Sequence, residues 1–199
     1  MNTIELTERF TVPFDSEYLT YETKLSAPAD FNEWDINSLI DLIIKQYHFN
    51  TRENVIVIYD LAQKVFSRHS EKHPEFAKLV EALYLFFDDL LFHLKKEEQI
   101  LFPNIIQLNE KKLHEGSFNY STFGVIKEYA ITMQKEHRDV VKQLEFFRQL
   151  TNDYVPPEDG SMLCQSLFSK MKQFENEMMQ HIQLENDFLF PKATRMDEN

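Results

Sequence analysis

A short pattern, His-x-x-x-Glu with Leu-Phe-Pro a few residues later, occurs twice in this sequence. The first copy contains His93 and Glu97, and the second contains His181 and Glu185. Residues four apart lie on the same face of a helix, so each copy directs one imidazole and one carboxylate the same way. Each copy is therefore suited to supply half of the ligands of a metal site.

Two further histidines extend this duplication. His48 precedes His93 by almost the same number of residues as His137 precedes His181. The two halves of the chain thus repeat a histidine, a chain reversal and a His-x-x-x-Glu pattern. The candidate ligands are His48, His93, Glu97, His137, His181 and Glu185. Imidazoles and carboxylates carried on the helices of a bundle suit a pair of iron ions.

The ligand types also indicate how the metal is held. A structural zinc site is disfavoured because the set contains no cysteine. Carboxylates can bridge two ions about 3.5 to 4 Å apart. We therefore expect Glu97 and Glu185 to bridge and each ion to take two histidines, which leaves room for an oxo or hydroxo bridge and an exogenous ligand. Ferritin-like sites use four glutamates and two histidines in Glu-x-x-His spacing, so the pattern points away from them.

A less specific interpretation applies to each residue alone. A single histidine on an apolar helix face is more often a hydrogen-bonded core residue than a ligand. Two buried carboxylates that face each other are costly in a core without a counter-charge, which favours a metal. A polar network without metal, or a site for another metal, is the alternative.

Charged residues beside the candidate ligands are interpreted as solvated. These are Lys95, Lys96 and Glu98 on one helix and Glu136 on another. Glu136, or Tyr47, would also suit the role of a hydrogen-bond partner that holds a ligating imidazole in place.

Four helices are needed to position these side chains. The chain has only three glycines, and its prolines lie at apparent boundaries, which favours an all-α fold. The expected helices run from Asp35 as N-cap to about His69, from Pro74 to about Pro103, over Ile126 to Phe147, and from Pro156 and Pro157 past Phe188. We predict an antiparallel up-down four-helix bundle, with all six candidate ligands on its apolar stripes. The residues predicted to face inward include Ile44 in the first helix, Ile126, Ala130, Met133, Val140, Leu144 and Phe147 in the third, and Phe188 in the fourth.

The helical register supports a common site for the first pair of histidines. His48 and His93 lie at nearly equal distances from the turn that joins their helices, whereas His137 and His181 do not. Residues 1–32 lack helical periodicity and are predicted to form an irregular arm. The predicted domains are this arm and a bundle over residues 33–199.

Composition sets further bounds. With 199 residues and 43% hydrophobic content, one domain is expected. The net charge of −12 argues against nucleic acids and anionic membranes as partners. The single cysteine, Cys164, excludes an internal disulfide and is interpreted as structural. No signal peptide or membrane-spanning stretch is evident, so we expect a cytoplasmic protein.

The sequence closely resembles a known family at several places. These are the two repeated blocks, including the run Lys-Glu-Glu-Gln-Ile-Leu-Phe-Pro after His93-Leu94, and the pairs Tyr47-His48 and Glu136-His137. The resemblance is to the hemerythrin-like domain of the Repair of Iron Centres family of di-iron proteins. The resemblance implies a non-haem di-iron centre with the four histidines as terminal ligands and the two glutamates as bridges. It also implies repair of iron-sulfur clusters damaged by oxidative or nitrosative stress, through iron donation or nitric oxide chemistry. Damaged or apo iron-sulfur proteins, or an assembly scaffold, are then the expected partners.

One departure from that family keeps an alternative open. Its members usually begin with a small helical domain that contains an adjacent cysteine pair, and residues 1–32 contain no cysteine. The alternative is a hemerythrin-like protein that binds or senses O2 or NO. Oxygen-carrying hemerythrins use a fifth histidine and an aspartate, so reversible oxygen carriage ranks lower. The sequence does not decide whether the protein is an enzyme.

Overall fold

The computed structural model describes residues 31–113 and 125–198. Within these ranges the chain is helical and contains no strand, which confirms the all-α prediction. The predicted arm lies almost wholly outside the described residues, as does the loop with Gly116 and Gly124. None of the described helices is long and apolar enough to cross a membrane.

The described helices are ten consecutive segments, three of which are π-helical. They are α2 (Ile36–Leu42), η2 (Ile43–His48), α3 (Phe49–His69), α4 (Glu75–Lys96), η3 (Glu97–Leu101), α5 (Phe102–Leu113), α6 (Val125–Leu150), α7 (Met162–Leu184), η5 (Glu185–Leu189) and α8 (Phe190–Glu198).

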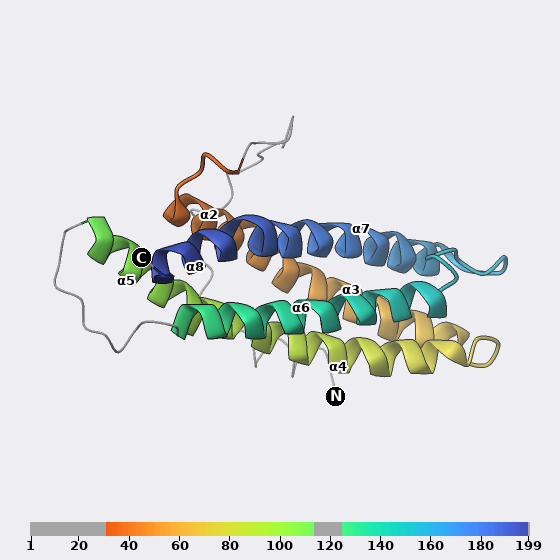
Figure 1. The fold of residues 1–199 in the computed structure, drawn as a ribbon. Coiled ribbons are helices and arrows are strands. Elements are labelled where there is room, and N and C mark those ends of the chain that lie inside the picture. The colour runs from red at the N-terminus through yellow and green to blue at the C-terminus, as the bar shows by residue number, and fades with distance from the viewer. Residues whose placement is uncertain (1–30, 114–124, 199) are drawn as a thin grey trace.

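Four long helices, α3, α4, α6 and α7, run along a common axis, and α2, α5 and α8 lie together at one end (Figure 1). Helix α3 packs against α4 and α7, and α4 packs against α6. The structure is therefore the predicted hemerythrin-like four-helix bundle, lengthened at one end by the helices that continue from it.

Two helix starts were predicted with different success. Asp35 caps α2 as expected, because its carboxylate accepts hydrogen bonds from the backbone N–H groups of Asn37 and Ser38. Helix α7 begins at Met162 rather than at the prolines, because the Ser161 hydroxyl caps it by accepting from the Cys164 N–H. Residues 151–161 form the connection from α6, and it takes up the uneven register noted in the sequence.

The buried apolar residues form two clusters. The larger one, centred on Ile58, Leu83 and Phe147, fills the end of the bundle near the α3–α4 turn. The smaller one, which includes Ile40, Phe102 and further residues of α2, α5 and α8, fills the other end. Along each long helix, the candidate ligands occupy the level where one cluster gives way to the other.

The π-helical turns coincide with candidate ligands. Segment η2 ends at His48, and η3 and η5 begin at Glu97 and Glu185. In η3 the N–H of Phe102 donates to the carbonyl of Glu97, and in η5 that of Phe190 donates to Glu185, each five residues back. A proline follows in both copies; it lacks an N–H, and its ring crowds the carbonyl four residues earlier, which favours a widened turn.

These turns shift the buried face of the helices. Phe188, predicted to face inward, is half-buried, and Leu189 is fully buried in its place. Likewise Ile43 rather than Ile44 is fully buried before His48. Helix α6 contains no π turn, and every residue predicted for its stripe, from Ile126 to Phe147, is buried.

The Asp35 cap gives a test of the fold. Asp35→Ala leaves the first N–H groups of α2 without their acceptor, so we expect the free energy of unfolding to fall by about 1 kcal/mol. Asp35→Asn is the matched control, since asparagine caps helices comparably and should retain most of the stability. Equilibrium urea unfolding of the three proteins measures the difference, and equal losses in both variants would contradict the cap.

Candidate metal centre

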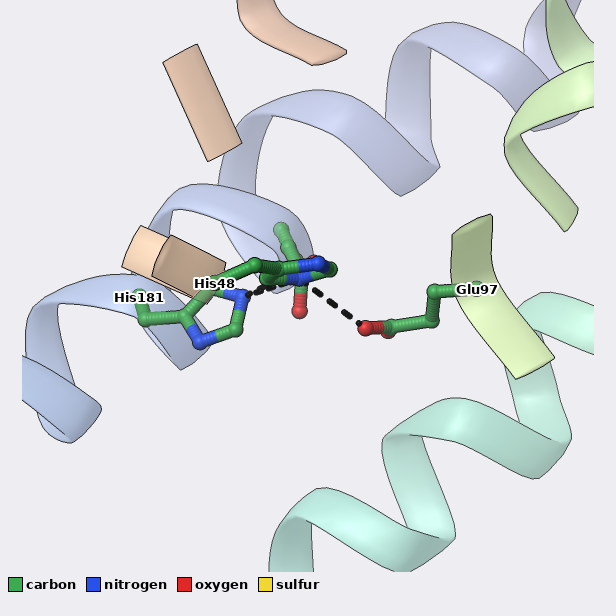
Figure 2. Close-up of side chains that lie close together, drawn as sticks. His48, Glu97 and His181 are labelled. Atoms are coloured by element: carbon green, nitrogen blue, oxygen red, sulfur yellow. Dashed lines mark hydrogen bonds and ion pairs between the residues drawn. The ribbon is translucent and has the colours of Figure 1, made fainter. Parts of the chain in front are cut away.

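All six candidate ligands lie at one level of the bundle core. His48 ends η2, His93 and His181 lie in α4 and α7, His137 lies in α6, and the two glutamates begin η3 and η5. None is more than 4% exposed. Figure 2 shows His48, His181 and Glu97 converging from three different elements.

The six side chains form two groups that share both glutamates. One group is His48, His181, Glu97 and Glu185, and the other is His93, His137, Glu97 and Glu185. In each group, one ligand atom per residue lies within 4.8 Å of all the others. This is an arrangement that could hold two metal ions side by side.

Each carboxylate presents one oxygen to each group. Glu97 Oε2 lies 3.4 Å from His48 Nε2, whereas its Oε1 lies 3.2 Å from His93 Nε2. Glu185 Oε1 lies 3.1 Å from His181 Nε2, whereas its Oε2 lies 3.1 Å from His137 Nε2. Both glutamates therefore have the orientation of bridging ligands.

The polar atoms at the centre fit a cation. The Nε2 atoms of His48 and His181 lie 3.2 Å apart, as do those of His93 and His137. Within the described part of the chain, the four carboxylate oxygens of Glu97 and Glu185 are buried and accept no hydrogen bond. Buried carboxylates without donors are costly unless a positive charge compensates them, so this donor set suits a metal site.

Three of the four imidazoles are held from outside through Nδ1. His48 Nδ1 donates to Glu98 at 2.7 Å, and Arg52 also binds that carboxylate. The interpretation of Glu98 as a solvated residue is therefore wrong. This hydrogen bond directs the Nε2 lone pair of His48 toward the candidate centre.

The other two outer partners support the imidazoles of the second group, His93 and His137. His93 Nδ1 donates to Glu136 at 2.8 Å, and Lys96 forms an ion pair with the same carboxylate. His137 Nδ1 donates to Asn186 at 3.0 Å. Glu136 thus has the supporting role that the sequence offered as one of two interpretations, and Asn186 was not anticipated.

The two groups are related by an approximate twofold repeat. The rings of His48 and His181 have centroids 4.9 Å apart at 66°, and those of His93 and His137 have centroids 4.9 Å apart at 64°. Phe102 stacks on His48, and Phe190, from the second Leu-Phe-Pro, stacks on His137. The duplicated sequence has therefore produced a duplicated site.

The mutual electrostatics of the cluster are strong. Burial lowers the pKa of His137, but the carboxylates of Glu185 and Glu97 outweigh it and raise the pKa to about 10. His93 likewise has a pKa raised to about 9 despite its burial, through Glu97 and Glu136. Burial raises the pKa of Glu97, but His93, His137 and His48 hold it well below the usual range. Burial and the charge of Glu97 raise the pKa of Glu185, but His181 and His137 outweigh them and lower it to about 2. Both carboxylates are therefore ionised at neutral pH.

A groove of about 420 Å³ between α4 and α6 reaches one of the two groups. His93 lines it, and the paired side chains of Lys96 and Glu136 lie beside it. Phe92, which is 61% exposed, also lines the groove.

The outer partners carried a signal in the sequence that was not used. Glu98 and Asn186 each follow a candidate bridging glutamate directly, at equivalent positions of the two copies. Each binds a histidine from another helix, and their equivalent positions in the two copies indicate a shared role.

A four-helix bundle with a buried layer of four histidines and two glutamates defines a hemerythrin-like, cation-binding class of protein. The chain matches the family described as "Hemerythrin HHE cation binding domain" over residues 39–193, and it belongs to that family.

The chain is also similar to proteins named "Iron-sulfur cluster repair protein YtfE". It is 32% identical to the one from Yersinia pseudotuberculosis serotype IB (strain PB1/+) over 181 residues, which cover 91% of this chain and 76% of the relative. The proteins of that name from Dickeya chrysanthemi (strain Ech1591) and Yersinia pestis (strain Pestoides F) are each 31% identical over the same shares.

The raised histidine pKa values predict proton release when metal binds. His93 and His137 hold an extra proton in the metal-free protein up to about pH 9 and 10, and ligation displaces it. We therefore expect Fe²⁺ to release protons at neutral pH and to bind more tightly as pH rises. A weakly buffered, anaerobic titration with a pH electrode measures this, and His93→Ala should release fewer protons. Binding without proton release would contradict the prediction.

Proposed function

We propose that residues 33–199 hold a non-haem di-iron centre and that the protein takes part in the repair of iron-sulfur clusters damaged by oxidative or nitrosative stress. His48 and His181 bind one iron ion, His93 and His137 bind the other, and Glu97 and Glu185 bridge them. The YtfE relatives, which bear the name iron-sulfur cluster repair protein, support the function over 91% of this chain.

A single observation carries the assignment of the ligands. The two oxygens of each buried glutamate face different histidine pairs at 3.1 to 3.4 Å, and none accepts a hydrogen bond within the described residues. A single ion at either group would leave the second oxygen of each carboxylate without a positive partner. Two ions that share them neutralise both charges and meet four imidazole nitrogens.

The protein residues define what a bound pair of iron ions can do. Iron held by these residues would supply one-electron redox chemistry. Two histidines and two carboxylates on each ion would leave room for a diatomic molecule such as NO or O2. The surrounding residues fix the imidazoles and neutralise charge: Glu98 with Arg52, and Glu136 with Lys96. Nitrogen and oxygen ligands without thiolate leave the iron open to transfer to an acceptor rich in cysteine sulfur.

Binding or sensing of O2 or NO is the second candidate function. The groove that reaches His93 supports it, because a diatomic molecule needs access to one of the two positions. It shares the di-iron centre with the first proposal and differs in whether iron leaves the protein.

The bridging assignment predicts different losses for glutamate and histidine variants. Glu97→Ala and Glu185→Ala each remove a ligand from both ions, so we expect less than one iron per chain. His48→Ala or His137→Ala removes a ligand from one ion and should leave about one iron per chain. Metal analysis and Mössbauer spectra of protein from iron-supplied cells measure this, with the exposed Glu145→Ala as control. Full occupancy in both glutamate variants excludes bridging.

Iron donation and gas binding give different outcomes in paired assays. If the protein donates iron, its reduced form should restore the activity of an apo iron-sulfur enzyme in the presence of sulfide and should lose iron in step. If it binds gas only, NO should change the absorption and EPR spectra while the iron content stays constant. His93→Ala, which lacks one ligand, serves as the control in both assays. A protein that neither transfers iron nor responds to NO would contradict both functions.

A further inference from the structure

The twofold repeat of the site is broken at the equivalent residues Glu136 and Tyr47. Glu136 directly precedes His137, and it accepts a hydrogen bond from Nδ1 of His93. Tyr47 directly precedes His48, and by the repeat it should hold His181 in the same way. Tyr47 instead stacks on the His181 ring, with centroids 5.5 Å apart at 18°.

His181 consequently lacks the support that the other three imidazoles have. Its Nδ1 is buried and has no hydrogen-bond partner among the described residues, although the side chain is only 2% exposed. Its equivalent in the other copy is His93, whose Nδ1 donates to the carboxylate of Glu136. The other pair of equivalents also differs, since a carboxylate holds His48 and an amide holds His137, but both of these imidazoles have an acceptor. Among the described residues, Nδ1 of His181 has none.

That missing hydrogen bond acts on the tautomer of His181. A histidine that ligates through Nε2 must carry its proton on Nδ1. In His48, His93 and His137 an acceptor holds the proton there and leaves the Nε2 lone pair directed at the centre. In neutral His181, the negative charge of Glu185, which lies 3.1 Å from Nε2, favours a proton on Nε2. Ligation must therefore move this proton to Nδ1, a buried nitrogen without an acceptor among the described residues.

We infer that the two metal positions have unequal affinity and that Tyr47, in place of a carboxylate, makes the position of His48 and His181 the weaker one. The inference rests on the proposed pair of metal ions. Loss of an outer hydrogen-bond partner of a ligating histidine typically lowers metal affinity by 10- to 100-fold, so we expect a gap of about that size. The ion at the weaker position binds second and leaves first, which makes it the one available to an acceptor.

The test is an anaerobic titration of the full-length, metal-free protein with Fe²⁺ against a chromogenic chelator. We expect two steps that differ by about 10- to 100-fold in affinity. His181→Ala should abolish the weak step and keep the tight one. His93→Ala should abolish the tight step and keep the weak one. Equal steps, or the opposite assignment in these two variants, would overturn the inference.

Two substitutions at Tyr47 separate the missing acceptor from the stacked ring. Tyr47→Glu places a carboxylate where Glu136 stands in the other half, and we expect the weak step to strengthen by about 10-fold or more. Tyr47→Phe retains the ring without supplying an acceptor, so both steps should stay as in the unchanged protein. The carboxylate of Glu177, which together with burial raises the pKa of Tyr47, also acts on a new carboxyl, so the titration is repeated at mildly alkaline pH.

A reciprocal variant decides the matter if Tyr47→Glu does not fold, as judged by circular dichroism. Glu136→Tyr removes the acceptor from His93 and should weaken the tight step by the same factor, which brings the two steps together. An unchanged tight step in folded Glu136→Tyr, or an unchanged weak step in folded Tyr47→Glu, overturns the inference. Fewer than two ions bound by the unchanged protein would instead overturn the proposed di-iron centre, so the two failures are distinguishable.

Discussion

Two ionised carboxylates buried side by side are the constraint on which this structure depends. Glu97 and Glu185 lie in the core without a hydrogen-bond donor among the described residues. Like charges so close together repel each other strongly at the low effective dielectric of a protein interior. Four imidazoles around them provide the compensation, either as cations that hold extra protons or as neutral ligands of bound metal. The same arrangement accounts for the raised pKa values of His93 and His137 and for the depressed pKa of Glu97.

The backbone adapts to this constraint through its widened turns. Each π turn inserts extra chain at the point where a helix delivers a ligand, and the proline of each Leu-Phe-Pro stabilises that geometry. The residue after each glutamate is thereby placed beside a histidine of another helix, as Glu98 beside His48 and Asn186 beside His137. The same local structure, present twice, places both a candidate bridging glutamate and the residue that orients a candidate histidine ligand.

Much of this could be predicted from the sequence because helical periodicity is a strong signal. Every predicted position of the α6 stripe is buried, and the six candidate ligands converge. The helical register had implied this for His48 and His93 but not for His137 and His181. Prediction failed where the helical period departs from 3.6 residues. A regular helix would bury Ile44 and Phe188, but the π turns bury the adjacent residues Ile43 and Leu189 more fully. The prediction that Glu98 is solvated failed for a related reason. Successive residues point about 100° apart on a regular helix, so Glu98 was expected to point away from the core. Its partner, His48, lies on another helix.

Helix α7 was predicted to begin at Pro156 and Pro157, but it begins after Ser161, whose hydroxyl caps it. Proline fixes its own backbone and is compatible with the first turn of a helix, but it does not require a helix to begin there. The hydroxyl that accepts an N–H does determine the first turn. Side-chain hydrogen bonds of this kind depend on a few tenths of an ångström, which the pattern of apolar residues does not encode.

The division of the apolar core into two clusters has a consequence for cooperativity. Because the polar layer lies between them along every long helix, few apolar contacts couple the two ends of the bundle directly. Metal that joins all four helices at this level makes the two ends unfold as one unit. Without it, the end built from α2, α5 and α8 has the smaller cluster and opens at a lower free energy than the rest. Metal bound at this level would therefore determine not only the stability of the bundle but also whether it unfolds as one cooperative unit or as two.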